Sequence, residues 1–111
     1  MHSDEVHKLD LGITADGDRV SISVGGELDT TTSPRLISIV RDVVSDRTGL
    51  IALDCSDVWF LDSAGVRALI VARNEAIRRG VDFALVRASG TVSRILDMTG
   101  LTATLTRTSV N

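Results

Sequence analysis

The sequence predicts an α/β fold, in which a mixed sheet of four to five strands packs against three or four α-helices. Two alternating apolar segments near the start indicate an N-terminal hairpin. Farther along, two continuous apolar runs, 50–53 and 83–86, have the length of buried strands, and a segment of helical periodicity separates them. Such alternation implies right-handed crossovers between parallel strands. The 111 residues suffice for one core, so we expect a single domain over 1–111 with its core at about 9–105.

The first part of the chain predicts a hairpin followed by a helix. Apolar residues alternate over 9–13 and again over 20–24, and the Asp-Gly-Asp sequence at 16–18 supplies the turn between them. The segment 25–29, with two glycines, breaks this alternation. Thr32-Ser33-Pro34 then predicts the start of a helix, whose apolar residues between 36 and 44 form one stripe that covers the core.

The rest of the chain repeats strand and helix. The run 50–53 predicts the central strand, and the polar residues that follow it predict a functional loop over 54–65. Beyond this loop the patterns predict, in order, a helix over 66–79 closed by Gly80, a strand over 83–86, a helix over 89–99 stopped by Gly100, and a short final strand over 101–105.

Composition excludes several classes of function. The formal charge of -3 leaves no basic field for a nucleic-acid backbone, so we expect no nucleic-acid partner. A single cysteine, Cys55, forms neither an internal disulfide nor a thiolate metal site and is interpreted as a small buried hydrophobe. No apolar run has the roughly 20 residues of a membrane span, and the polar N-terminus does not resemble a signal peptide, so we expect a cytoplasmic protein.

The start of the second predicted helix, at Asp62-Ser63, carries the chemistry of most interest. Asp62 is predicted to be an N-cap whose carboxylate accepts from backbone N–H groups of the next turn, and this leaves the Ser63 hydroxyl at the helix end. A phosphate on that hydroxyl would lie where free N–H groups and the helix dipole tolerate negative charge. Phosphorylation is therefore compatible with the fold and would change the surface charge strongly.

These segments together resemble a known family. Gly26-Glu27-Leu28-Asp29, Thr32-Ser33-Pro34, the strand 50–54, the loop 58–61 and Asp62-Ser63-Ala64-Gly65-Val66 look like a STAS domain of the bacterial anti-sigma factor antagonist type. The resemblance runs from about Leu9 to about Leu105. It is carried by the combination of the Asp-Ser-Ala-Gly and Gly-Glu-Leu-Asp elements, since neither alone is specific.

The resemblance implies a phosphorylation switch without catalysis by this chain. In the family, the serine that aligns with Ser63 is phosphorylated by an anti-sigma factor, a serine kinase with a histidine-kinase-like ATPase fold. The unphosphorylated antagonist binds that kinase and frees the sigma factor, and a PP2C-type phosphatase restores the binding form. No cofactor, metal or catalytic residue is expected, and partner contacts are expected from the following residues: Asp29, Thr30, Trp59, Asp62, Ala64, Gly65 and Arg67.

The chain departs from the family pattern at three places. Ala64 stands where relatives commonly have a second serine, so no second acceptor lies next to Ser63. Arg67 stands where many members have a small or apolar residue. Six residues follow Leu105 where members commonly end in a further amphipathic helix, so that helix is expected to be missing or reduced.

Other interpretations remain open at this point. Ser63 could simply satisfy a backbone group at the helix start, and Thr31 or Thr32 could accept phosphate in its place. Of the adjacent aromatic residues Trp59 and Phe60, one is expected to face the core, with Trp59 the more exposed.

Two other roles are also considered for the whole chain. A STAS scaffold or adaptor subunit of a lipid-transport or stress-signalling complex would use the same face without obligatory phosphorylation. A small enzyme would use the carboxylates of Asp54, Asp57 and Asp62 as a Mg²⁺ site or as a phosphoacceptor. The absence of a G-x-S-x-G elbow argues against a serine nucleophile.

Overall fold

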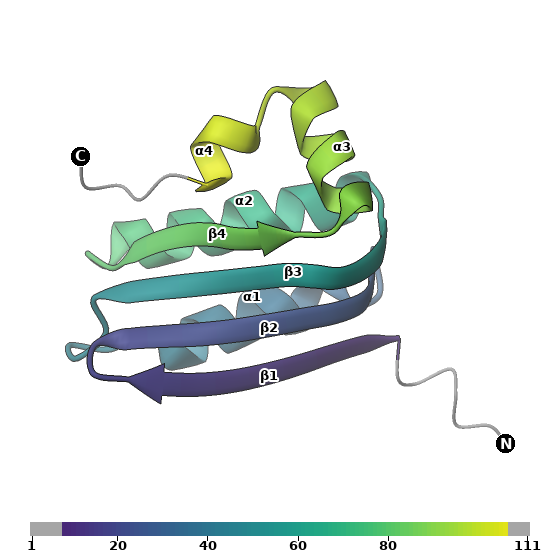
Figure 1. Cartoon of the computed structure of the whole chain (residues 1–111). Coiled ribbons are helices and arrows are strands. Elements are labelled where there is room, and N and C mark those ends of the chain that lie inside the picture. The colour runs from purple at the N-terminus through teal and green to yellow at the C-terminus, as the bar shows by residue number, and fades with distance from the viewer. Residues whose placement is uncertain (1–7, 107–111) are drawn as a thin grey trace, which may run out of the picture.

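The fold is a single mixed sheet with helices, as the sequence predicted. The computed structural model describes residues 8–106 (Figure 1). The elements follow in the order β1 (Leu9–Asp16), β2 (Arg19–Leu28), α1 (Ser33–Val43), β3 (Leu50–Leu61), α2 (Ser63–Arg78), β4 (Asp82–Ala88), α3 (Gly90–Thr99) and α4 (Thr102–Thr106). The four strands form one sheet in the order β1-β2-β3-β4. β1 pairs antiparallel with β2, and the other two pairings are parallel.

The N-terminal hairpin has the predicted turn. Asp16 pairs with Arg19, and Gly17 takes a positive φ of 63° at the tip, where glycine carries no steric penalty. Val20, Ile22 and Val24 of β2 are buried, whereas most of β1 is exposed. The alternation of apolar residues therefore marks the face that packs on the core.

β2 continues through the glycine pair, although the alternation breaks there. The strand runs to Leu28, and its register against β3 shifts twice between Ser23 and Glu27. Gly26 has a φ of 100°, and its Cα lies so close to the Lys8 carbonyl that a side chain would collide with it. The glycines thus mark bulges in a longer strand rather than its end.

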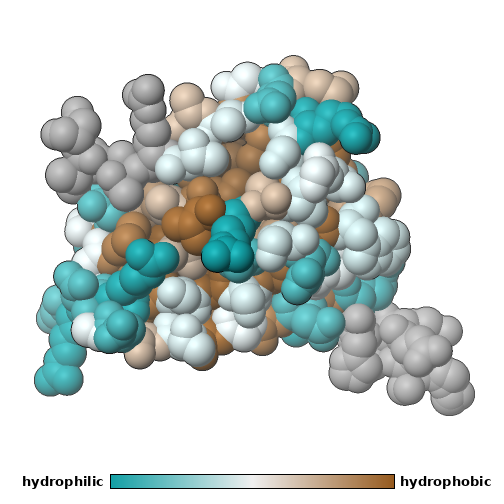
Figure 2. All heavy atoms as spheres, in the orientation of Figure 1, coloured by the Kyte–Doolittle hydropathy of each residue, from teal (hydrophilic) through white to brown (hydrophobic). Residues whose placement is uncertain are grey.

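Helices α1 and α2 cover one face of the sheet, behind the strands in Figure 1. Leu36 and Val40 of α1 and Leu69 and Ala72 of α2 are fully or almost fully buried there. The opposite face of the sheet is directed toward the viewer in Figure 2, where white and teal side chains surround a smaller brown area. Of the described residues 8–106, no helix is long and apolar enough to cross a membrane.

The segment expected to be a functional loop is mostly strand. β3 extends from Leu50 to Leu61, because its parallel pairing with β2 continues as far as Leu28↔Leu61. Its pairing with β4 ends earlier, at Cys55↔Ala88, so the second half of β3 has a neighbouring strand on one side only, and on the other side Ser89, the N-cap of α3, donates to the Val58 carbonyl. The prediction of a loop over 54–65 was wrong, because 54–61 belongs to β3 and 63–65 to α2; polar residues such as Ser56 and Asp57 lie on an exposed part of the strand and not in a connection.

The C-terminal part also differs from the expectation. The segment 101–105 was predicted as a strand, but Thr102–Thr106 forms the short helix α4. Leu101 and Leu105 are four residues apart, a spacing that suits a helix as well as an alternating strand. Gly100 ends α3 in the left-handed conformation, and the buried Leu105 fixes the new helix against the core.

Candidate functional site

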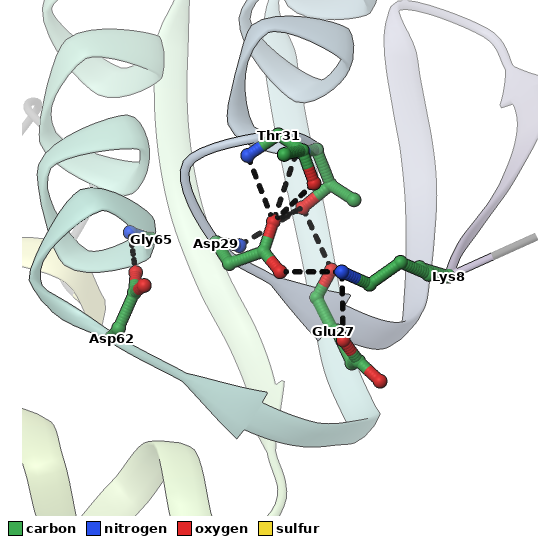
Figure 3. A network of polar contacts seen from close by, with 7 residues as sticks. Lys8, Glu27, Asp29, Thr31, Asp62 and Gly65 are labelled. Carbon is green, nitrogen blue, oxygen red and sulfur yellow. Dashed lines mark hydrogen bonds and ion pairs between the residues drawn. The ribbon is translucent and has the colours of Figure 1, made fainter. Parts of the chain in front are cut away.

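The candidate site lies where β2 and β3 end side by side, each followed by a helix. Because the two strands are parallel, Leu28 pairs with Leu61, and the chain enters α1 and α2 from neighbouring positions. The Asp62 N–H donates to the Leu28 carbonyl at 3.4 Å, and the Ser33 hydroxyl donates to the Ala64 carbonyl at 3.2 Å. These bonds join the two helix starts into one surface. Figure 3 shows Asp62 on one of these neighbouring turns and Asp29 on the other.

The start of α2 has the geometry predicted for it. Asp62 is the N-cap, in an extended conformation, and its Oδ1 accepts from the Gly65 N–H at 3.0 Å. Ser63 is the first helical residue and is exposed. Among the described residues, none forms a hydrogen bond with the Ser63 hydroxyl. The carboxylate of Asp62 therefore performs the capping, and the Ser63 hydroxyl is left available to a partner.

Gly65 allows the start of α2 to approach the strand ends closely. A Cβ at this position would overlap the Leu28 carbonyl and touch the Leu61 side chain. Gly65 is itself buried, whereas its neighbour Ala64 is half-buried. The glycine of the Asp-Ser-Ala-Gly element thus has a packing role that holds Ser63 in position.

The start of α1 is organised around Asp29. Its Oδ1 accepts from the Thr31 N–H at 2.9 Å, the Thr31 hydroxyl at 2.8 Å and the Thr32 N–H at 3.1 Å. Hydrogen bonds from Thr31, together with Lys8 and Thr32, hold the pKa of the Asp29 carboxyl far below its ordinary value. Asp29 is thus the Asx-type turn residue considered from the sequence, and its neighbour Thr30 is exposed.

Lys8 completes this network and was missed by the sequence analysis. Its ammonium lies 3.2 Å from an Asp29 carboxylate oxygen and 3.4 Å from one of Glu27 (Figure 3). Hydrogen bonds to Asp29 and then Glu27 raise the pKa of Lys8. The contact depends on the register of the hairpin, which places Lys8 opposite Glu27. A sequence analysis could have predicted it only by first assigning that register.

The two threonines considered as other phosphate acceptors are both engaged. The Thr31 hydroxyl donates to Asp29. Thr32 is buried, donates its hydroxyl to the Glu27 carbonyl at 2.8 Å and accepts from the Asp29 N–H at 2.9 Å. Phosphorylation of either hydroxyl would therefore break the turn before α1.

The exposed aromatic residues lie on the last part of β3. Trp59 is 63% exposed and Phe60 is 41% exposed, so Trp59 is the more exposed, as predicted. The expectation that one of them faces the core was wrong, since β3 has lost its neighbour β4 by this point. Their rings are arranged edge to face, with their centroids 6.3 Å apart. Arg67 is exposed on α2, one turn after Ser63.

The carboxylates considered for an enzyme do not converge. Asp54 accepts from the Ser56 hydroxyl at 2.6 Å and from the Ser56 N–H at 2.9 Å, and these bonds lower the pKa of the Asp54 carboxyl. Asp57 projects from a later position on β3, and Asp62 caps α2. Within residues 8–106, no three His, Cys, Asp or Glu side chains form a group that could hold a metal ion.

Cys55 is buried, as the sequence suggested. Burial, and secondarily the charge of Asp54, raises the pKa of the Cys55 thiol to about 12. A thiol in such a position stays protonated and packs as a small apolar side chain.

Comparison with known proteins agrees with this geometry. The STAS domain family matches residues 13–110. The anti-sigma-F factor antagonist RsfB of Mycobacterium tuberculosis is 33% identical over 83 residues, which are 75% of this chain and 67% of that protein. An anti-sigma-B factor antagonist of Staphylococcus aureus is 25% identical over 93 residues, covering 84% of this chain and 86% of that protein.

Solved structures show the same fold. The crystal structure of an anti-sigma factor antagonist from Mycobacterium paratuberculosis superposes with a TM-score of 0.75 at 27% identity, covering 87% of this chain and 82% of that chain. The anti-sigma factor antagonist SpoIIAA in its unphosphorylated form gives a TM-score of 0.69 at 21% identity, over 86% of this chain and 83% of that chain. From the sequence match and the fold together, the chain belongs to the STAS domain family.

Proposed function

We propose that this chain is an anti-sigma factor antagonist, controlled by phosphorylation of Ser63. In its unphosphorylated form it binds an anti-sigma factor that is a serine kinase, and the sigma factor is released. The observation that carries the proposal is the exposed, unbonded hydroxyl of Ser63 at the start of α2. The names of the relatives, which are antagonists of anti-sigma-F and anti-sigma-B factors, support the same role.

The charges around Ser63 explain how a phosphate would act as a switch. A phosphoserine adds about -1.5 to -2 charges at neutral pH, and here it would stand next to Asp62, with Asp29 in the adjoining turn. The helix dipole and the first N–H groups of α2 tolerate this charge, so the fold is retained. A partner surface that fits the neutral hydroxyl would meet a strongly negative group and bind less tightly.

The remaining predicted residues would form the contact surface around this hydroxyl. Trp59 provides exposed apolar area of the kind that anchors interfaces. Thr30 and Arg67 are exposed on the neighbouring turn and helix face, and Asp29 and Asp62 hold those two segments in shape. Gly65 contributes by packing, since it is buried.

The chemistry would be supplied by the partners. The kinase, of the histidine-kinase-like ATPase fold, would bring ATP, and a PP2C-type phosphatase would remove the phosphate in the cytoplasm. This chain would contribute the acceptor and no catalytic group.

The decisive experiment combines modification and binding. The purified chain is incubated with ATP and an anti-sigma factor kinase encoded beside its gene, and its intact mass is measured. We expect one phosphate on the wild type and on Thr31→Ala, and none on Ser63→Ala. Calorimetry with the kinase should show that phosphorylation weakens binding on the order of tenfold or more.

Two outcomes would contradict the proposal. Phosphate on Ser63→Ala would place the acceptor elsewhere. Full binding by the Ser63-phosphorylated chain would remove the switch and favour an adaptor that docks through this face without obligatory phosphorylation. Ser63→Ala is the control for binding, since it should bind the kinase about as well as the unphosphorylated wild type.

A further inference from the structure

The outer edge of β1 is an open sheet edge. The other edge strand, β4, packs against α4, whereas among residues 8–106 no helix or strand lies beyond β1 in Figure 1. β1 is eight residues long and contains no proline, and its Ile13 is 47% exposed. A strand with these properties presents unpaired backbone groups that another strand can extend.

The hydrogen-bonding register shows which groups are free. The Glu27 N–H donates to the Lys8 carbonyl at 2.7 Å. The backbone N–H and C=O groups of Lys8 and of every second residue after it are therefore directed toward β2. The Leu9 carbonyl is directed to the other side and accepts from the Arg35 guanidinium at 2.9 Å. The backbone groups of Leu11, Ile13 and Ala15 therefore face outward along the open edge.

We propose that two copies of this chain pair through β1, antiparallel and centred on Gly12. The two sheets would then form one continuous sheet across a twofold axis. In this register Leu11 of each copy is hydrogen-bonded to Ile13 of the other, and the Gly12 residues face each other in the non-hydrogen-bonded position. This interaction goes beyond the proposed function and does not depend on it.

Charge selects this register from the others that the backbone allows. The two strands must pair through residues whose backbone groups face outward. Near the middle of β1, this permits the twofold axis to pass by Leu11, Gly12 or Ile13. With the centre at Gly12, Lys8 of each copy lies opposite Asp16 of the other, so the Lys8 ammonium, already 3.2 Å from Asp29 and 3.4 Å from Glu27, would also face an opposite charge. A centre at Ile13 would place Asp10 of each copy opposite Asp16 of the other, which repel each other as like charges. A centre at Leu11 would place Lys8 opposite the uncharged Thr14, without the attraction that the Gly12 register provides.

Apolar contacts favour the same register. Side chains of Leu11 and Ile13 lie on the face that packs toward the helices, as their pairing with the buried Val24 and Ile22 shows. Ile13 of one copy would lie against Leu11 of the other, twice. It would also reach the shallow groove between β1 and α1, to which Leu11 and Ile39 contribute. The pairing thus covers Ile13, which the single chain leaves exposed, and the exposed part of the half-buried Leu11.

The first test measures association directly. Sedimentation velocity over a concentration series should show a reversible dimer for the wild type. Ile13→Asp should weaken it at least about tenfold in Kd, because two cross-strand apolar pairs are lost. Val86→Asp is the matched control, since Val86 is a strand residue of equal exposure (46%) on β4, and it should leave the dimer unchanged. A wild type that stays monomeric throughout would overturn the proposal, as would an Ile13→Asp dimer of unchanged Kd.

The second test reports the register. Gly12→Cys places two thiols at a non-hydrogen-bonded pair, where Cα atoms are about 4.5 Å apart, and it should form a symmetric disulfide on mild oxidation. The new side chain meets only the Ser23 hydroxyl, which can rotate away. Thr14→Cys is the control, because its two thiols would lie about 13 Å apart along the strands. Intact mass separates this product from any reaction of Cys55. Equal cross-linking of both variants, or none of Gly12→Cys, would contradict the register.

Discussion

Two serines occupy the same position at the starts of two neighbouring helices, but their surroundings differ. Ser33 is the first residue of α1 and Ser63 the first residue of α2. Ser33 is 7% exposed, and its hydroxyl is bonded to the Ala64 carbonyl. Ser63 is exposed, and no described group bonds to its hydroxyl. The same residue type at the same helical position therefore serves packing in one case and is available to a partner in the other.

The difference arises from how each turn satisfies its backbone. Before α1, Asp29 and Thr32 form a closed set of bonds, and Thr32 itself makes no capping bond as N-cap. Before α2, the only side-chain bond that caps the helix is the one from the Gly65 N–H to the Asp62 carboxylate, among the described residues. A helix start that needs few bonds leaves its first hydroxyl free, which is what a phosphorylation site requires.

The largest expected effect comes from removing the close approach that positions Ser63. Gly65→Ala forces a methyl group against the Leu28 carbonyl and Leu61, so the start of α2 must shift. We expect a loss of about 2–3 kcal/mol in the free energy of unfolding, measured by urea denaturation. Gly90→Ala, at the start of α3, is the control, because no atom lies within 4 Å of its added Cβ. Equal stability of the two variants would contradict the packing role.

A smaller loss is expected when the cap of α2 is removed. Asp62→Ala leaves the Gly65 N–H without its acceptor and should cost about 1 kcal/mol. Asp62→Asn retains a capping oxygen and should cost much less. If both variants lose the same amount, the carboxylate charge rather than the capping bond stabilises this helix start.

The turn before α1 should show its contribution as a dependence on acid. The pKa of Asp29 is lower in the folded state than its ordinary value near 4. Its stabilising effect is therefore fully present above about pH 4 and is lost as pH falls toward the folded pKa. The effect is modest because water reaches and screens the partly exposed ion pair with Lys8.

Urea midpoints at about pH 6 and about pH 3 test this effect. The wild type should lose more stability between them than Asp29→Asn. Other carboxyls with lowered pKa, such as Asp54, contribute equally to both proteins and cancel in the difference. An identical loss in wild type and variant would show that Asp29 titrates alike in the folded and unfolded chains.

The two helix starts also differ in how far the sequence predicted them. The cap by Asp62 and the position of Ser63 depend on residues within one turn, so local chemistry was sufficient. The partnership of Lys8 with Asp29 joins residues far apart in the chain and depends on the register of β1 on β2. The burial of Ser33 likewise follows from the approach of α1 to α2, which no local pattern encodes.

The same distinction explains the incorrect elements. The segment 101–105 carries too few apolar residues to separate a helix from a strand, and its outcome depends on where Leu105 packs. In the second half of β3, Val58 and Leu61 are buried, while Ser56 and Asp57 are exposed on a strand that pairs with β2 but no longer with β4. The periodicity of apolar residues reflects burial, so it does not predict a strand whose residues are hydrogen-bonded in the sheet but exposed to solvent.

The smallest expected effect on stability belongs to Ser63. Ser63→Ala should change the free energy of unfolding by less than about 0.5 kcal/mol, because the hydroxyl makes no bond and Asp62 retains the cap. Ser33→Ala, its matched variant, removes the bond to the Ala64 carbonyl and should cost about 1 kcal/mol. Urea denaturation of both variants compares them under one condition. A loss at Ser63 as large as that at Ser33 would mean that its hydroxyl holds the helix start, and a group needed for folding is poorly suited to be switched.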